Sequence, residues 1–155
     1  MKYCNFCGNS VQTVGTKSTC SACGKVTYDN PKATTGLLLY SPDKKYFIVS
    51  TRAGEPKKGK LDTFGGFLEP YETLEAGTLR ELNEEAGLSA DEIGEIVYLG
   101  STAHEYEWGG YTTYTSAAWF MAELRTERPL EPSDNLVDSQ KNFILEAIAN
   151  FKYPR

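Results

Sequence analysis

The sequence predicts an α/β domain with a mixed sheet flanked by helices, preceded by a small ribbon folded around a metal. Three observations lead to this fold class. The predicted elements come in the order strands, helix, strands, helix, without an internal repeat. All four cysteines lie within the first 23 residues. The length of 155 residues, with 40% hydrophobic and 24% charged residues, suits one globular domain with an appendage.

Two CxxC pairs define the ribbon, and a glycine follows each pair directly. Four thiolates at this spacing are typical of tetrahedral, structural zinc. The alternatives are two disulfides, which the missing export signal disfavours, and a redox CxxC, which leaves the other pair unexplained. A ribbon of about 28 residues buries too little apolar surface to fold alone, so we expect the metal to stabilise it. The predicted zinc ligands are Cys4, Cys7, Cys20 and Cys23.

A turn sequence separates the ribbon from the main domain. Asn-Pro within YDNPK forces an extended residue and places the boundary between a zinc ribbon at 1–30 and a main domain at 31–155. Two β-rich runs, 33–41 and 45–52, are joined by SPDK as a hairpin. A loop rich in Gly and Pro follows, with a short strand at Leu61–Phe64.

The second half of the main domain repeats the alternation of helix and strands. A helix is predicted between an N-cap at Thr73 and a left-handed C-cap at Gly87. Two long β-rich runs, 95–108 and 111–124, form a hairpin around a Gly-Gly turn. An amphipathic stretch at 139–151 predicts a closing helix.

Charge and hydropathy narrow the class of function. No apolar run approaches the roughly 20 residues that span a bilayer, and no signal-peptide core is present, so we expect a cytoplasmic protein without a membrane partner. The net charge of −5 argues against a nucleic-acid partner. Nine acidic residues and one arginine lie between Glu69 and Glu95, next to an upstream basic segment. Such neighbours favour a site for a divalent cation and a phosphate. The basic residues are Arg52, Lys57, Lys58 and Lys60.

Three glutamates crowd the end of the predicted helix. At about 100° per residue, Glu84 and Glu85 lie on either side of Glu81. Like charges at the negative end of the helix dipole repel one another, and a hard divalent ion with oxygen ligands would compensate them. The alternative is a solvated acidic face. A separate stripe is expected to face the sheet and consists of Leu79, Leu82 and Ala86.

The chain resembles the Nudix box at every defining position of the pattern Gly66-x5-Glu72-x7-Arg80-Glu81-Leu82-x-Glu84-Glu85-x-Gly87-Leu88. A four-Cys ribbon followed by YDNP is similar to the zinc-ribbon subgroup that includes NADH pyrophosphatases. The resemblance implies a Nudix-type α/β/α sandwich with a mixed sheet. It also implies hydrolysis of a nucleoside diphosphate linked to another moiety, hence a small-molecule nucleotide partner. A homodimer is left open, because dimers are common in the family.

The resemblance also implies roles for the residues of the box. Mg²⁺ or Mn²⁺ would be held by glutamate side chains and a glycine carbonyl; these ligands are Glu81, Glu84, Glu85 and Gly66. Arg80 would orient Glu81 or Glu84, and Glu72 would anchor the loop to the helix. Metal ions neutralise the diphosphate and acidify a water, and a carboxylate takes its proton. Glu81 or Glu84 is the favoured base, and the open alternatives are Glu123, Glu131 and Asp134.

Residues outside the box must set the substrate. Flat aromatic side chains suit adenine, and cations suit phosphate; the candidates are Arg52, Lys60, Tyr106, Trp108 and Tyr111. The alternatives without a binding role are that the aromatic residues form cross-strand pairs and that the basic residues belong to a solvated loop. The lone histidine, His104, is interpreted as a packing or surface residue. The region STAHEYEWGGYTTYT replaces the Ser-Gln-Pro-Trp-like array of NADH pyrophosphatases, which ranks ADP-ribose ahead of NADH.

Two further departures from the family lie in the loop before the helix. Thr63-Phe64 stands where Leu-Pro is common, and Tyr71 replaces a frequent glycine. We expect both to alter the loop and not the metal ligands. A second class of function stays open, a non-catalytic Nudix domain that senses a nucleotide, with the ribbon as a contact module. The complete box favours the enzyme, because sensors can lose the metal-binding glutamates.

Overall fold

The structure is a computed structural model that describes residues 3–55, 57–125 and 136–138. The chain forms two compact units, Met1–Pro31 and Lys32–Arg155. Among the described residues, no helix has the length and apolar character needed to cross a membrane. The closing helix predicted at 139–151 lies outside the described residues, as do Glu131 and Asp134.

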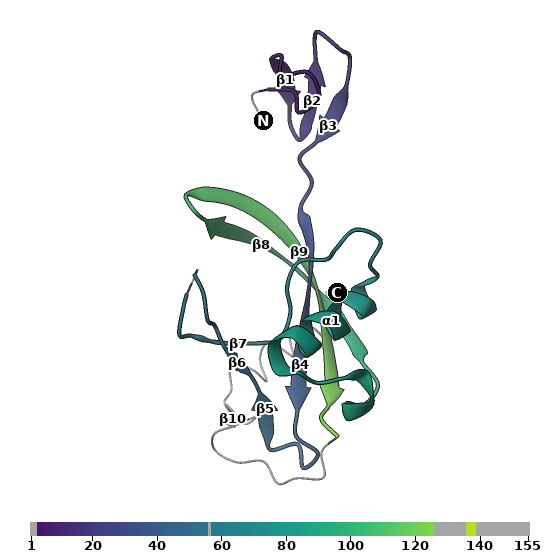
Figure 1. Ribbon diagram of the computed structural model, residues 1–155, viewed down its shortest axis with the longest axis vertical. Coiled ribbons are helices and arrows are strands. Elements are labelled where there is room, and N and C mark those ends of the chain that lie inside the picture. Colours follow the sequence, from purple (N-terminus) through teal and green to yellow (C-terminus); the bar gives the residue numbers. More distant parts are fainter. Residues whose placement is uncertain (1–2, 56, 126–135, 139–155) are drawn as a thin grey trace, which may run out of the picture. The chain divides into compact units, whose positions relative to one another are not determined.

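The first unit is a three-stranded antiparallel sheet in the order β1-β2-β3 (Figure 1). Its strands are β1 Val11–Val14, β2 Lys17–Cys20 and β3 Val26–Tyr28. Backbone hydrogen bonds at each CxxC pair curl the chain back, from Gly8 N–H to the Cys4 carbonyl at 2.9 Å and from Gly24 N–H to the Cys20 carbonyl at 3.0 Å. The unit therefore has the small-ribbon form that the cysteine spacing predicts.

The second unit is built on a five-stranded sheet in the order β10-β5-β4-β9-β8. The pair β4·β9 is parallel and the other pairs are antiparallel, so the predicted mixed sheet is confirmed. Both predicted hairpins are present, β4·β5 and β8·β9. The strands are β4 Lys32–Tyr40, β5 Tyr46–Ile48, β8 Val97–Trp108, β9 Tyr111–Glu123 and β10 Leu136–Asp138.

Three short elements complete the described fold. Strands β6 Ser50–Thr51 and β7 Leu61–Asp62 form a small two-stranded sheet, and the 3₁₀ turn η1 spans Ala90–Glu92. Neither η1 nor β10 is predicted from the sequence, because a single turn and a three-residue strand carry too little periodicity. The predicted strand Leu61–Phe64 is confirmed for its first half, while Phe64 makes an isolated bridge to Leu37.

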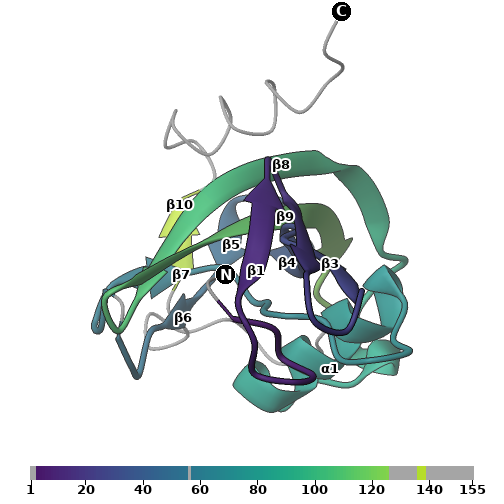
Figure 2. The same ribbon diagram turned by 90° about the horizontal axis from the view of Figure 1, so that it is seen from above.

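The helix α1, Leu74–Ala86, has both predicted caps. The Thr73 hydroxyl accepts from Ala76 N–H at 3.2 Å, and Gly87 ends the helix in the left-handed region with φ 68°. Figure 2 shows α1 on one side of the sheet, where Leu82 is fully buried. The expectation that Ala86 faces the sheet is wrong. Ala86 is the last residue of the helix and is exposed, and the last helix residue that is buried is Leu82, one turn earlier.

Strand alternation divides the sheet into two faces. Even-numbered residues of β9 from Ala118 onwards pack under α1 with Leu37 and Leu39 of β4. Odd-numbered residues of β9, such as Trp119, therefore point to the opposite face. This second face is available for a site, since α1 covers the first.

Tyr71 in the loop before α1 adopts φ 69°, and its side chain is fully exposed. A left-handed backbone is strained for tyrosine but not for glycine. This explains why glycine is frequent at this position in the family that the sequence resembles. Tyr71→Gly is therefore expected to raise the free energy of unfolding by about 1 kcal/mol. Urea denaturation followed by circular dichroism measures the change.

Tyr71→Ala is the matched control for this substitution. Alanine also removes the exposed ring, but its Cβ keeps the left-handed strain, so we expect little gain. Equal stability of the Gly and Ala variants would contradict a backbone origin.

Candidate active site

Arg80 is the centre of the acidic end of α1. Its guanidinium pairs with three carboxylates, Glu72 at 2.8 Å, Glu81 at 3.0 Å and Glu84 at 3.2 Å. It also donates to the Phe67 carbonyl at 3.0 Å. These bonds to anions raise the pKa of Arg80, which remains fully charged. Part of the charge compensation that the sequence assigns to a metal thus comes from one arginine.

Glu72 joins the loop before α1 to the helix. The carboxylate accepts from Arg80 and from Glu69 N–H, the latter at 2.9 Å. The hydrogen bond from Arg80 and that from the Glu69 backbone hold the pKa of the Glu72 carboxyl below its usual range. Gly77 leaves room for this arrangement, because a Cβ there would meet a Glu72 oxygen at 2.9 Å. This geometry agrees with an anchoring role for Glu72.

The carboxylates and Gly66 fit a hard divalent cation in their chemistry. The Glu81 carboxylate lies against Gly66 so closely that a Cβ at this position would collide with it. Glu85 accepts from Gly65 N–H at 3.0 Å, and desolvation together with the charge of Glu81 raises the pKa of Glu85. Three carboxylates pair with the Arg80 guanidinium and Glu85 adds a fourth near Gly65, so the helix end stays negative. Oxygen donors in a negative setting are what Mg²⁺ and Mn²⁺ prefer.

The glutamates are nevertheless spread more widely than the cysteines. Among the described residues, a group of potential ligands lying within 4.8 Å of one another is formed by the four cysteine sulfurs. The carboxylates of Glu81 and Glu84 both pair with Arg80, whereas the carboxylate of Glu85 accepts a hydrogen bond from Gly65 N–H. The helix geometry therefore brings the three glutamates to one end of α1, and Arg80 holds two of them apart from the third.

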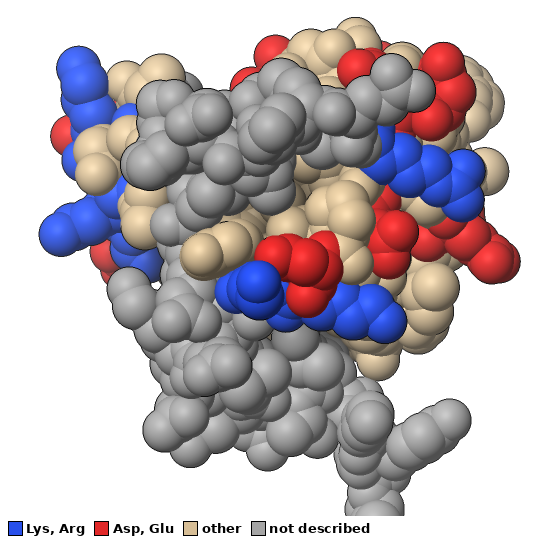
Figure 3. Space-filling view, turned by 90° about the horizontal axis from the view of Figure 1, so that it is seen from below, with Lys and Arg blue, Asp and Glu red and all other residues tan. Residues whose placement is uncertain are grey.

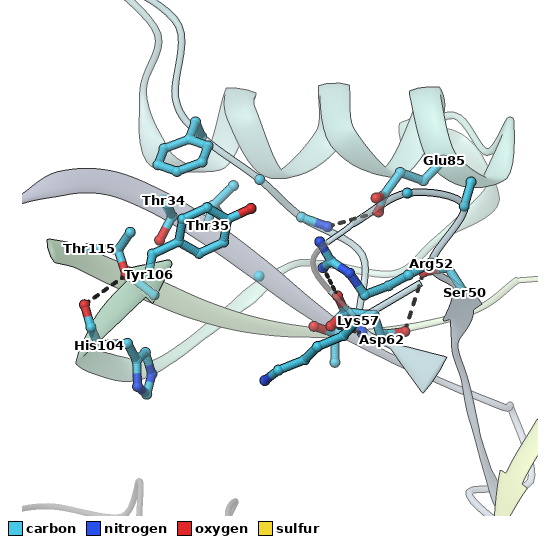
Figure 4. Close-up of a pocket in the computed structure, with 18 of the residues that line it drawn as sticks. Thr34, Thr35, Ser50, Arg52, Lys57, Asp62, Glu85, His104, Tyr106 and Thr115 are labelled. Atoms are coloured by element: carbon cyan, nitrogen blue, oxygen red, sulfur yellow. Dashed lines mark hydrogen bonds and ion pairs between the residues drawn. The ribbon is translucent and has the colours of Figure 1, made fainter. Parts of the chain in front are cut away.

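A cleft of about 940 Å³ adjoins this helix end. Figure 4 shows Glu85 reaching into it from α1, with Arg52 and Lys57 opposite and Tyr106 further along. Its described lining comes from α1, the Gly65-Gly66 loop, β4, β8, β9 and the loop between β6 and β7. Anionic, cationic and aromatic side chains thus share one space.

The cationic side of the cleft is held in place by an ion pair. Arg52 pairs with Asp62, and the hydrogen bond that Arg52 donates to this carboxylate, with a smaller contribution from Tyr106, raises the pKa of Arg52. Figure 3 shows one group of positive side chains at the left edge, the side on which the β6–β7 loop lies in Figure 1; other positive side chains lie at the centre and right beside acidic ones. Lys57 lines the cleft, whereas Lys60 is not among the described lining residues.

Of the aromatic residues predicted to bind substrate, one lines the cleft and another does not. Tyr106 lines the cleft and packs edge-on against Phe67, with ring centroids 5.6 Å apart. Tyr111 is 81% exposed and does not belong to the described lining. The backbone of Trp108 pairs with Tyr111 at the end of the hairpin, and the Trp108 side chain lies outside what the structure describes.

The residues of the predicted box fall into two groups, those that line the cleft and those that lie behind its surface. Glu84, Glu85 and Gly66 line the cleft, while Arg80 and Glu72 support them from the loop and the helix. Glu81 reaches the same place through its contact with Gly66.

Sequence reasoning missed several lining residues. Trp119, Asp62 and the threonines of β4 line the cleft, and so does His104, which the sequence assigned to packing or surface. Trp119 was hidden in the apolar run AAWFMA. The run carries no alternation of apolar and polar residues that would have separated its two faces. Only the structure shows that Ala118 and Phe120 are buried on the other face.

The four cysteines form a second candidate site, in the first unit. The Cys4 and Cys23 sulfurs lie 3.7 Å apart and those of Cys7 and Cys20 lie 3.5 Å apart, and none of the four is in a disulfide. A tetrahedron with Zn–S bonds of about 2.3 Å has S···S edges of about 3.8 Å. The sulfurs are therefore arranged as ligands of a tetrahedral metal.

Comparisons with known proteins agree with this fold. The crystal structure of a NUDIX hydrolase from Nitrosomonas europaea is similar, with a TM-score of 0.58 and 23% identity, covering 91% of this chain and 80% of that chain. The C. elegans Ap4A hydrolase has a TM-score of 0.58 and 18% identity, covering 79% and 96% of the two chains. No curated protein sequence matches the chain.

A third similar structure is the NUDIX domain of Shewanella oneidensis NrtR complexed with ADP ribose. It has a TM-score of 0.56 and 15% identity, covering 81% of this chain and 91% of that chain. The sequence itself matches the NUDIX domain family over residues 30–150, most of its length. The chain therefore belongs to the Nudix family.

Proposed function

We propose that this Nudix pyrophosphatase cleaves the diphosphate bond of an ADP-linked compound, with ADP-ribose ahead of NADH. The observation that carries the proposal is the composition of the cleft. The negative end of α1, the cations Arg52 and Lys57, and the ring of Tyr106 all border one space of about 940 Å³. A nucleoside diphosphate derivative needs partners of these three kinds.

The chain's own residues would divide the work. Glu81, Glu84, Glu85 and Gly66 would hold Mg²⁺ or Mn²⁺, which when bound neutralises the diphosphate oxygens and makes water more acidic. Arg52 and Lys57 would contact phosphate oxygens on the opposite side of the cleft. Glu81 or Glu84 would accept the proton of the attacking water. The ion pair between Arg80 and Glu72 would hold the loop before α1 in place against the helix.

The choice of an ADP-linked compound rests on ring chemistry and on a comparison. Aromatic side chains border the cleft, and a flat ring favours stacking of a nucleobase. The NUDIX domain of NrtR, which shares this fold, is described as complexed with ADP ribose. ADP-ribose precedes NADH because the downstream array of NADH pyrophosphatases is absent. A cytoplasmic address and a homodimer belong to the same proposal.

A substrate panel tests the proposal. The purified chain is incubated with ADP-ribose, NADH, FAD, a nucleotide sugar and nucleoside triphosphates, each with Mg²⁺ or Mn²⁺. ADP-ribose is expected to give AMP and ribose 5-phosphate by chromatography, at the highest kcat/KM of the panel. Turnover restricted to nucleoside triphosphates would contradict the ADP-linked assignment. Binding of ADP-ribose by calorimetry without product would favour the sensor instead.

A further inference from the structure

Trp119 lies on the face of the sheet that α1 does not cover. It stands between the buried residues Ala118 and Phe120 on β9, so strand alternation turns its side chain the other way. The side chain is half-buried and lines the cleft. A tryptophan at this place is not required by the core, which is formed on the other face.

The indole ring is fixed from two sides. Gly36 of β4 stands opposite Trp119 in the parallel register, and a Cβ at Gly36 would collide with the six-membered part of the ring. The ring therefore packs directly on the backbone of β4. Its Nε1–H donates to the Thr102 hydroxyl of β8 at 2.9 Å. An aromatic surface held in this way loses little conformational entropy when a ligand stacks on it.

His104 is tied to the same hydroxyl. Its Nε2 lies 2.6 Å from Thr102 Oγ1, and the imidazole is exposed in the cleft. The Thr102 hydroxyl thus bonds both the Trp119 indole and the His104 ring, and the other ring nitrogen of His104, Nδ1, is left to contact a ligand. A flat ring and a polar ring are thus held side by side through one threonine.

This part of the cleft differs from the end of α1 in its charge. The lining residues that share the strand face of Trp119 on β4 and β9 are uncharged: Thr34, Gly36, Thr115 and Ala117. Glu105 also lines the cleft, but it follows His104 on β8, so strand alternation turns its side chain to the other face. Figure 4 shows Thr34, Thr115 and His104 on the side away from Glu85. The diphosphate requires the charged end, so the uncharged end suits a planar, weakly polar group.

We infer that Trp119 is the platform on which the base of the nucleotide substrate stacks, with His104 contacting the polar edge of that base. The inference rests on the proposed function and adds a specificity-determining residue to it. Tyr106 packs edge-on against Phe67 and interacts with Arg52, so it lies beside a cation that is proposed to contact the diphosphate and not at the uncharged end. Stacking of one base on an aromatic side chain strengthens binding by about tenfold or more.

Two single-tryptophan proteins test the inference without turnover. The chain has two tryptophans, so Trp108→Phe leaves Trp119 as the sole indole and Trp119→Phe leaves Trp108. AMP is expected to quench the fluorescence of the Trp108→Phe protein, because its base stacks on Trp119. Ribose 5-phosphate, which has a phosphate and no base, should leave the emission unchanged. The Trp119→Phe protein should show no quenching by AMP.

Kinetics provide the second readout. Trp119→Leu is expected to raise KM for ADP-ribose by about tenfold or more, from the stacking energy, with kcat changed by less than about threefold. Trp119→Phe keeps a ring and should raise KM less. Circular dichroism of both variants confirms that the fold is intact, and the fluorescence titration does not depend on removing the Trp119 indole.

The outcomes separate the inference from the proposed function. Quenching confined to the protein that retains Trp108, or absent from both proteins, would overturn the role of Trp119 even if ADP-ribose is hydrolysed. Quenching of Trp119 by AMP would support the role even if the panel shows another nucleotide as substrate, in which case only the ADP-linked assignment fails.

Discussion

Glu84→Gln is expected to lower kcat by a factor on the order of 10³ or more while leaving the fold intact. Glutamine has the same shape but no charge, so the variant removes a ligand of the proposed cation at the point where negative charge develops on the diphosphate. Initial rates with the best substrate of the panel measure the effect. Retention of near-full activity would exclude Glu84 from the site.

Glu84 is a suitable residue for this test because its structural role is small. Its side chain is 56% exposed, lines the cleft, and makes one ion pair with Arg80, which also pairs with Glu72 and Glu81. An exposed pair of this kind contributes little to stability. Glu75→Gln is the matched control, since Glu75 is exposed in the first turn of the same helix. It makes the same charge change and should leave kcat unchanged.

Thermal unfolding supplies a second readout for the same pair of variants. Millimolar Mg²⁺ or Mn²⁺ should raise Tm of the unmodified protein, because ion binding to the native state relieves repulsion among the carboxylates. The increase should be smaller for Glu84→Gln and preserved for Glu75→Gln. An equal increase in all three proteins would place the ion elsewhere.

The sequence predicts the regular part of the fold well because that part depends on local patterns. The caps at Thr73 and Gly87 and the two hairpins follow from residue types at fixed spacing, and all are present. The cysteine spacing likewise predicts a cluster that the structure forms. Each of these features needs few residues and short sequence separations.

The cleft could be predicted only in part, because long-range packing forms it. Helical geometry places Glu81, Glu84 and Glu85 together, but it does not show that Arg80 reaches both the helix and the loop. Similarly, Trp119 becomes a lining residue through Gly36, 83 positions earlier in the chain, and only the parallel register of β4 and β9 brings the two together. Neither residue carries a local signal of that contact.

The ribbon offers the second large expected effect, because its described residues bury almost nothing besides the sulfur ligands. Cys4, Ser18 and Cys20 are its buried residues, whereas five large apolar side chains are exposed. The exposed ones are Tyr3, Phe6, Val14, Val26 and Tyr28. Without an apolar core, we expect the folded ribbon to depend on a zinc ion held by the four cysteines.

Cys20→Ser is therefore expected to abolish zinc binding and to unfold the unit Met1–Pro31, while the unit that begins at Lys32 stays folded. Structural zinc contributes on the order of 10 kcal/mol, and a ribbon with three buried residues has no other term of that size. Metal analysis should give one zinc per unmodified chain. Amide NMR spectra should show ribbon signals collapsing to the unfolded region in the variant and after chelation.

Ser21→Ala is the control for the zinc experiment, since it changes an exposed residue of the same CxxC pair without touching a sulfur. It should retain zinc and the dispersed ribbon signals. The opposite result, dispersed ribbon signals in metal-free Cys20→Ser protein, would mean that the three strands fold without a metal. The Cys20 sulfur would then act through packing, because it is 1% exposed. That reading requires an apolar core around Cys20, and the exposed side chains of the ribbon do not provide one.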